Sequence, residues 1–297
     1  MRRRQQNKRL SLISDIIIFL IVLLILTLWI NHIDLTSVIS QSEKYQEVLA
    51  LNDENTDDVV SQNKAYIQKI KDKYNITIKY GDSVKQMAQK VSATELSDGN
   101  IVNKNIGKIE TELEKYPDNF FNLFKTDSTK YSITIILLDK FSDSNLALAS
   151  RNNLNEYKIY LSNTEDFSRA FEHEMFHIIE YYTIDITGNT DVFNGWNKLN
   201  PYKFSYDDDI YKLDNTYVYT NTFSLSNAFF VTKYSKTSPK EDRAETFAEL
   251  MTLKTKPIYL NNNENIRKKA DLLSSVISKS INLNMDDSQV YWNRYLK

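Results

Sequence analysis

The sequence has no cysteine, and its 297 residues include only five glycines, four prolines and three histidines. Without cysteine the chain can form neither a disulfide nor a thiolate metal site, and it has no cysteine nucleophile. The absence of disulfides is also compatible with an exported protein that does not rely on them. Few glycines and prolines indicate an AT-rich bacterial genome rather than any function. Because histidine is so scarce, its positions are informative.

The chain also lacks an excess of positive charge, since its formal net charge is −2. Removing the five basic residues at the N-terminus leaves about −7 on the remainder. No basic patch or stacking motif of the kind that binds nucleic acid is apparent, so the sequence predicts no nucleic-acid partner. The five basic residues are Arg2, Arg3, Arg4, Lys8 and Arg9.

This basic segment is followed by an apolar one. Residues 1–9 are predicted to be a cytoplasmic tail, and residues 10–30 a membrane span, since about 20 apolar residues cross a bilayer. Positive charge before the span predicts that the N-terminus stays inside and the remainder is extracytoplasmic. A cleaved signal peptide is the alternative, but the long apolar run and the missing small-x-small site favour an uncleaved anchor. We therefore expect a single-pass protein of the cell membrane in a Gram-positive bacterium.

His173, Glu174 and His177 form the pattern H-E-x-x-H, which uses two of the three histidines. On a helix, residues i and i+4 share one face, so both imidazoles can bind one metal ion. Glu174 can then take a proton from a water molecule at that metal. The alternative is a helix that carries two histidines by coincidence, which their scarcity disfavours. The pattern predicts a zinc hydrolase.

A catalytic zinc site needs a third protein ligand, and no histidine follows His177. Downstream, Glu241, Glu245 and Glu249 recur every four residues and would lie on one face of a helix. One of them could bind the metal, while the glutamate one turn later accepts the free N–H of a ligating histidine. The alternative is a solvated acidic face. Apolar residues elsewhere in this segment favour a partly buried stripe that has a partner.

Together, the two segments resemble the gluzincin-type zinc metallopeptidases that include anthrax lethal factor and the bacterial Pro-Pro endopeptidases. In that group a segment of the type E-x-x-A-E supplies the glutamate ligand, and a tyrosine seven positions earlier assists catalysis. Here Glu241 to Glu245 reads E-D-R-A-E, and Tyr234 stands seven positions before Glu241. The resemblance therefore implies a zinc ion, Zn²⁺, as the cofactor, with the ligands His173, His177 and Glu241.

The resemblance also implies roles for two neighbouring side chains. Glu245 would be the carboxylate behind a histidine ligand, and Tyr234 would donate a hydrogen bond to the oxyanion. Sliding the pattern by four residues makes Glu245 the ligand instead, but this alternative breaks the tyrosine spacing. The gap after His177 is longer than in the Pro-Pro endopeptidases and contains residues 196–201, so the resemblance assigns this insertion no role.

The hydrophobic pattern predicts three strands, of which residues 131–139 are the most apolar and should be central. Strands are predicted at 76–80, 131–139 and 157–162, and helices at 83–91, 104–116, 165–182, 239–254 and 264–281. Strands, then a ligand-bearing helix, then a helical C-terminal part is the zincin order. The resemblance thus implies an α+β, zincin-like domain over residues 74–297.

Two further expectations concern organisation. Residues 31–73 are polar and acidic, which predicts a stalk, although residues 58–73 could form a helix. The strand at 157–162 precedes the H-E-x-x-H helix and is the candidate edge of the substrate cleft, with an ordinary inner strand as the alternative.

The function implied is a membrane-anchored, exported zinc peptidase that acts on a peptide or protein, with Glu174 as general base. One alternative is a catalytically inactive zinc-binding protein that mediates interactions at the cell surface. Another is a structural surface protein in which the H-E-x-x-H pattern is incidental. Metal content separates the last possibility from the other two, and peptide cleavage separates the first two.

Overall fold

The computed structural model describes residues 56–124, 131–152, 156–219, 227–256, 260, 263–281 and 290–296. These residues belong to one compact unit, 56–297. The predicted tail, the predicted span at 10–30 and the first part of the predicted stalk lie outside the described residues. Within the described ranges, no helix is both long enough and apolar enough to cross a membrane.

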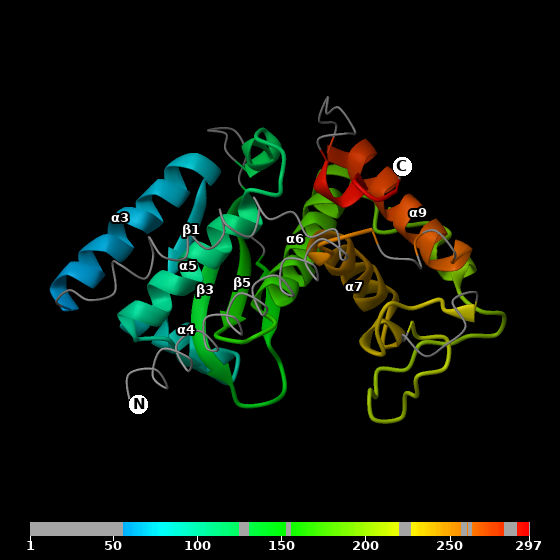
Figure 1. The fold of residues 1–297 in the computed structure, drawn as a ribbon, viewed down its shortest axis with the longest axis horizontal. Coiled ribbons are helices and arrows are strands. Elements are labelled where there is room, and N and C mark those ends of the chain that lie inside the picture. Colours follow the sequence, from blue (N-terminus) through cyan, green and yellow to red (C-terminus); the bar gives the residue numbers. More distant parts are fainter. Residues whose placement is uncertain are drawn as a thin grey trace, which may run out of the picture. The chain divides into compact units, whose positions relative to one another are not determined.

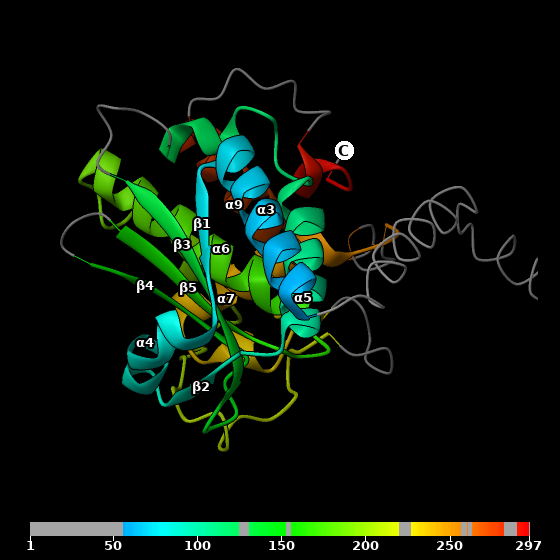
Figure 2. The ribbon, with the colours of Figure 1, turned by 90° about the vertical axis from the view of Figure 1, so that its left-hand side faces the viewer.

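A mixed five-stranded sheet forms one half of this unit (Figure 2). Its strand order is β1-β3-β5-β4, and β2 pairs with β3 outside that path. β1 and β5 run parallel to β3, whereas β2 and β4 are antiparallel to their neighbours. The strands are β1 (Ile76–Lys79), β2 (Ala93–Glu95), β3 (Ser132–Phe141), β4 (Ala147–Arg151) and β5 (Glu156–Ser162).

The edge of the sheet next to the H-E-x-x-H helix differs from the expectation. β5 lies between β3 and β4 and is an inner strand, so the prediction that residues 157–162 form the cleft edge is wrong. The edge is β4, which pairs antiparallel with β5 from Ala147 opposite Leu161 to Arg151 opposite Tyr157. The sequence of β4, ALASR, contains no β-branched or aromatic residue, so local propensity does not indicate a strand there.

The helices lie on both sides of α6 (Phe167–Thr187), the helix that carries H-E-x-x-H (Figure 1). On one side are the sheet, α3, α4 and α5; on the other are α7 and α9. The helices are α3 (Thr56–Tyr74), α4 (Lys85–Lys90), α5 (Gly99–Leu113), α7 (Pro239–Thr252) and α9 (Glu264–Ile281). The predicted α+β class with a small mixed sheet is confirmed.

α3 includes the last part of the predicted stalk. It packs against α5 and β1, and Ile70 is fully buried at that contact. The Asn63 amide donates a hydrogen bond to the Gly99 carbonyl, and its oxygen accepts one from Asn103. Residues 56–73 therefore belong to the compact unit, because these buried contacts are made with sequence-distant residues that the local polarity of the segment does not reveal.

Helix ends follow local capping chemistry. α6 runs to Thr187 and ends at Gly188, whose φ of 64° is the left-handed conformation that glycine adopts most easily. α5 begins at Gly99, earlier than expected, because the Asp98 carboxylate caps the N–H groups of Asn100 and Ile101. The 83–91 helix is divided into a 3₁₀ turn, Gly81–Val84, and the short α4.

Candidate metal centre and active site

α6 is buried on nearly all sides, which explains why its polar residues are placed so specifically. Phe171, Met175 and Ile178 pack in the main hydrophobic core. The polar residues His173, Glu174 and His177 are also buried, each at most 7% exposed. Buried polar groups must find partners. Those of the two histidines come mainly from α7.

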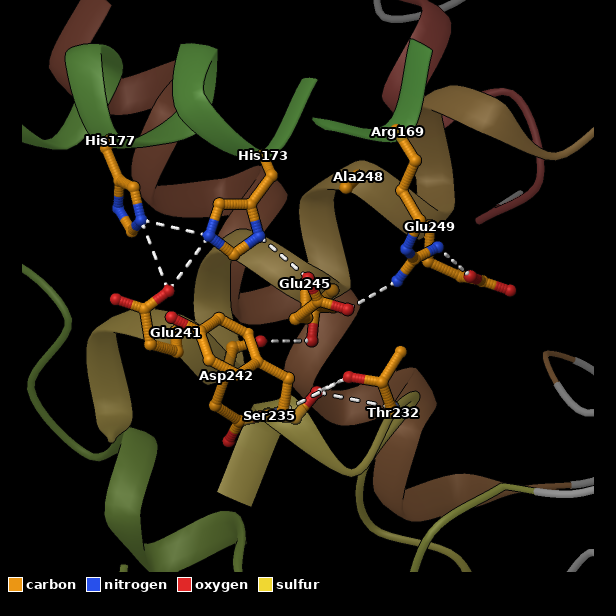
Figure 3. A network of polar contacts seen from close by, with 12 residues as sticks. Arg169, His173, His177, Thr232, Ser235, Glu241, Asp242, Glu245, Ala248 and Glu249 are labelled. Atoms are coloured by element: carbon orange, nitrogen blue, oxygen red, sulfur yellow. Dashed lines mark hydrogen bonds and ion pairs between the residues drawn. The ribbon is translucent and has the colours of Figure 1, made fainter. Parts of the chain in front are cut away.

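The two histidines and Glu241 converge on one point (Figure 3). His173 Nε2 lies 2.9 Å from Glu241 Oε2 and 3.1 Å from His177 Nε2, and His177 Nε2 lies 3.4 Å from Glu241 Oε2. A tetrahedral zinc ion with bonds of about 2.0–2.1 Å separates its ligand atoms by about 3.3 Å. The three side chains therefore fit a metal ion, and two imidazoles with one carboxylate are a donor set that zinc accepts.

The start of α7 explains how Glu241 is positioned. Ser238 is the N-cap residue, and its hydroxyl accepts a hydrogen bond from the Glu241 N–H at 3.1 Å. In a capping box, the glutamate at this position turns back toward the N-cap residue. Here the Glu241 carboxylate instead faces His173 and His177. The Ser238 N-cap thus fixes the backbone of Glu241, while the Glu241 side chain remains able to face the two histidines.

Glu245 lies one turn further along α7, behind His173. Its Oε1 is 2.8 Å from His173 Nδ1, on the side of the ring away from Glu241. Its other oxygen accepts a hydrogen bond from Arg169 at 2.7 Å, and Arg169 also binds Glu249 at 2.7 Å. The described geometry therefore places Glu245 as the carboxylate that orients His173. Arg169 was not anticipated, although it lies four residues before His173 on the same helix face.

In the metal-free site, the pKa values of the two histidines are shifted in opposite directions. Burial opposes a charge on His173, but its hydrogen bonds to Glu241 and Glu245 outweigh this and raise its pKa to about 10. Burial lowers the pKa of His177 to about 4. Burial alone would raise the pKa of Glu245, but its hydrogen bond to His173 and the charge of Arg169 outweigh burial and lower the pKa to about 2. The pKa of Glu241 is held below its ordinary range in the same way.

Glu174 faces the edge strand rather than α7. The backbone N–H of Ala149 on β4 lies near its carboxylate. Burial raises the pKa of Glu174 to about 7 despite the positive charge of His173 nearby. A carboxylate that titrates near neutral pH is suited to accept a proton and release it again.

Tyr234 lies on a 3₁₀ turn, Tyr234–Lys236, that leads into α7. Its ring centre is 5.9 Å from that of His173, and 41% of the residue is exposed. Burial, together with the negative charge of Glu241, raises the pKa of Tyr234, so its hydroxyl stays protonated and remains a donor. Side-chain and backbone hydrogen bonds between Thr232 and Ser235 stabilise the turn.

The insertion around residues 196–201 is anchored to α7 through Trp196. Trp196 is 2% exposed, and its indole N–H donates to Asp242 at 2.9 Å. Asp242 also accepts from the Tyr206 hydroxyl at 2.8 Å and from Lys269 of α9 at 2.6 Å. This buried network joins the insertion, α7 and α9 next to Glu241. This network was not predicted, because Asp242 occupies a variable position of E-x-x-A-E and Lys269 belongs to no recognised pattern.

Comparison with known proteins adds little to this geometry. No protein-family model matches the sequence, and no curated protein matches it. Among solved structures, the chain is similar to a proposed zinc-binding metallo-peptidase from Bacteroides caccae, with 16% identity and a TM-score of 0.42. The similarity covers 82% of this chain and 93% of the other. With so low a TM-score, it supports no conclusion about the present chain.

Proposed function

We propose that this protein is a zinc-dependent peptidase of the gluzincin type, related in its site to anthrax lethal factor and the Pro-Pro endopeptidases. The observation that carries the proposal is the convergence of His173, His177 and Glu241 on one point, beside the buried carboxylate of Glu174. We also propose that residues 10–30 anchor the chain in the cell membrane, with the catalytic unit outside.

His173, His177 and Glu241 would hold the zinc ion. When bound, the ion would supply a Lewis acid that polarises a peptide carbonyl and makes a nearby water more acidic. Glu245 keeps the His173 ring in place through Nδ1, so that Nε2 faces the metal position. Arg169 in turn holds Glu245.

Glu174 is the proposed general base. It would accept the proton of the attacking water and then pass it to the leaving amine. The Ala149 N–H lies near this carboxylate, on the strand along which we propose that the substrate binds.

Tyr234 is the proposed donor to the oxyanion. It lies beside His173 and remains protonated because its pKa is raised. The turn that carries it is tied to the segment between α6 and α7, because Lys236 Nζ donates to the Asp214 and Thr216 carbonyls at 3.0 and 3.1 Å. One hydroxyl donor of this type contributes on the order of 3 kcal/mol to transition-state stabilisation.

The substrate would bind as an extended peptide along β4. An edge strand offers backbone hydrogen bonds that a peptide can complete. β4 is the edge of the sheet nearest α6, and Leu148 on this strand is 39% exposed. This placement brings the scissile bond next to Glu174.

The test uses the full-length chain, purified in detergent and loaded with zinc. We expect one zinc per chain and cleavage of peptides from a proteome-derived library, measured by metal analysis and mass spectrometry. Glu174→Gln should retain zinc and lose cleavage, because an amide cannot accept the proton. His173→Ala should lose the metal. Cleavage by Glu174→Gln at the wild-type rate would exclude the proposed mechanism.

A further inference from the structure

Two cations lie near Tyr181, one helical turn beyond His177. Lys240 Nζ is 2.7 Å from the Tyr181 hydroxyl and 4.7 Å from the centre of its ring. The guanidinium carbon of Arg151 lies 5.2 Å from the same ring centre. Tyr181 follows His177 by four residues and therefore shares its face of α6. The two cations thus lie around one side chain on the helix face that also carries His177, and Arg151 is paired there with Asp185.

The position of Lys240 is unfavourable for helix formation. It lies in the first turn of α7, where the helix dipole disfavours a positive charge. Among the described residues, no carboxylate oxygen lies within 4.0 Å of its ammonium group, and its hydrogen-bond partner is the Tyr181 hydroxyl. Burial raises the pKa of Glu174 and that of Glu180, and the charge of Lys240 partly opposes both increases. A residue that breaks a local rule beside a candidate active site is a candidate for function.

The Arg151 side chain is held by an ion pair but remains partly exposed to solvent. It is the last residue of β4, and 39% of its side chain is exposed. Its Nη1 binds Asp185, which also accepts a hydrogen bond from the Tyr157 hydroxyl at 2.8 Å. A guanidinium group has five N–H donors, so the contact with Asp185 orients it without using all of them.

The strand geometry relates these cations to the scissile bond. The backbone N–H of Ala149 lies near Glu174, and Arg151 stands two residues further along β4. Because strand side chains alternate, the side chains of Ala149 and Arg151 lie on the same face of the strand. A peptide paired with β4 would place the group beside Arg151 about two residues from the scissile bond, at about 3.3 Å per residue. Tyr181 lies four residues beyond His177 along α6, or about 6 Å at 1.5 Å per residue, which agrees with this spacing.

We propose that Arg151 and Lys240 bind a carboxylate of the substrate, about two residues from the scissile bond. This inference rests on the proposed peptidase function and adds a preference for acidic peptides. A guanidinium fork and an ammonium group are the usual partners of a carboxylate. The carboxylate can come from an aspartate or glutamate side chain or from the C-terminus of a short peptide.

The experiment compares cleavage sites in two peptide libraries with the zinc-loaded, full-length protein. One library has free C-termini and the other has amidated C-termini. We expect Asp and Glu to be enriched about tenfold at one position near the scissile bond, as one charge-assisted contact allows. Enrichment in both libraries identifies a side chain, whereas cleavage close to free C-termini alone identifies the terminal carboxylate.

Variants and a binding assay separate this inference from the proposed function. Arg151→Gln and Lys240→Gln should each reduce the acidic preference several-fold, and Arg151→Glu should shift it toward Lys and Arg. Lys85→Gln, which changes a lysine on α4 that is 58% exposed, should leave it unchanged. The affinity of zinc-loaded Glu174→Gln for a fluorescent acidic peptide should show the same dependence on Arg151 without turnover.

Each outcome decides one of the two proposals. Zinc-dependent cleavage that ignores acidic groups, or an acidic preference that survives Arg151→Glu, would overturn the inference while leaving the peptidase intact. Absence of any zinc-dependent cleavage would overturn the proposed function, and this inference with it.

Discussion

The proton carried by His173 offers a sharp test of the metal centre, because it can be measured without turnover. In the metal-free protein, Glu245 accepts from Nδ1 and Glu241 faces Nε2, and together they raise the pKa of His173 from 6.5 to about 10. At pH 8, about 99% of such a group is protonated, against about 3% at the ordinary value. His177, whose pKa is lowered to about 4, should be neutral at the same pH.

The assay is a pH titration of the imidazole resonances by NMR on the chelated, full-length protein with ¹³C-labelled histidine. Because the chain has three histidines, His173→Ala and His177→Ala are enough to assign the spectrum. We expect one resonance to titrate near pH 10 and another to stay neutral down to about pH 5. Glu245→Gln should lower the His173 pKa by at least about one unit, or ~1.4 kcal/mol, since a charged acceptor is lost.

The same shift predicts how the stability of the metal-free protein depends on pH. The folded-state pKa of His173 is raised, so its contribution is complete below pH 6.5 and is lost as pH rises through 10. The contribution is at most about 5 kcal/mol, the equivalent of the full pKa shift. Zinc replaces the Nε2 proton, so the loaded protein should not lose this stability. Titration of both histidines near pH 6.5 would refute the assigned network.

Four further predictions use the same protein. Glu174→Gln should raise the melting temperature of the metal-free form at pH 8 but not at pH 4. The raised pKa of Glu174 destabilises the folded state only as pH rises from 4.5 through 7, by on the order of 3 kcal/mol. Equal melting temperatures of the variant and the wild type at pH 8 would remove the assignment of Glu174 as a buried carboxylate. In titrations with a competing chelator, Glu241→Gln should lose most of its zinc affinity, whereas the affinity of Glu245→Gln should fall about 10–100-fold. A larger loss of affinity in Glu245→Gln than in Glu241→Gln would make Glu245 the ligand. Tyr234→Phe should retain zinc and lower kcat about 10²-fold with little change in KM, as measured by steady-state kinetics; a change confined to KM would remove its role at the oxyanion. Protease added to intact cells should digest the part beyond residue 34, and full protection would reverse the proposed topology.

Much of the candidate site could be predicted because it depends on the spacing of residues within single helices. H-E-x-x-H places His173 and His177 on one face of any helix, and scarcity of histidine makes the pattern informative. The four-residue spacing of Glu241 and Glu245 likewise requires only that the segment be helical. The long helices were predicted for the same reason, since their apolar periodicity is a property of consecutive residues.

Pairing between distant segments could not be predicted in this way. The edge strand is β4 rather than residues 157–162, because its short ALASR segment becomes a strand by hydrogen bonding to β5. α3 reads as polar, yet contacts with α5 and β1 bury Ile70 and Asn63. In both cases the deciding energy comes from partners that are separated along the chain, and local composition does not report on it.

The sequence by itself determined which side chains could bind a metal and which carboxylate could act as a base. Only the tertiary structure decided how they are distributed, with Glu241 facing both histidines and Glu245 behind His173. It also decided that Asp242 of α7 joins Trp196 and Lys269 in a buried network next to Glu241. The physical reason is that helix spacing fixes faces along one element, whereas the packing of α6 against α7 fixes which faces meet.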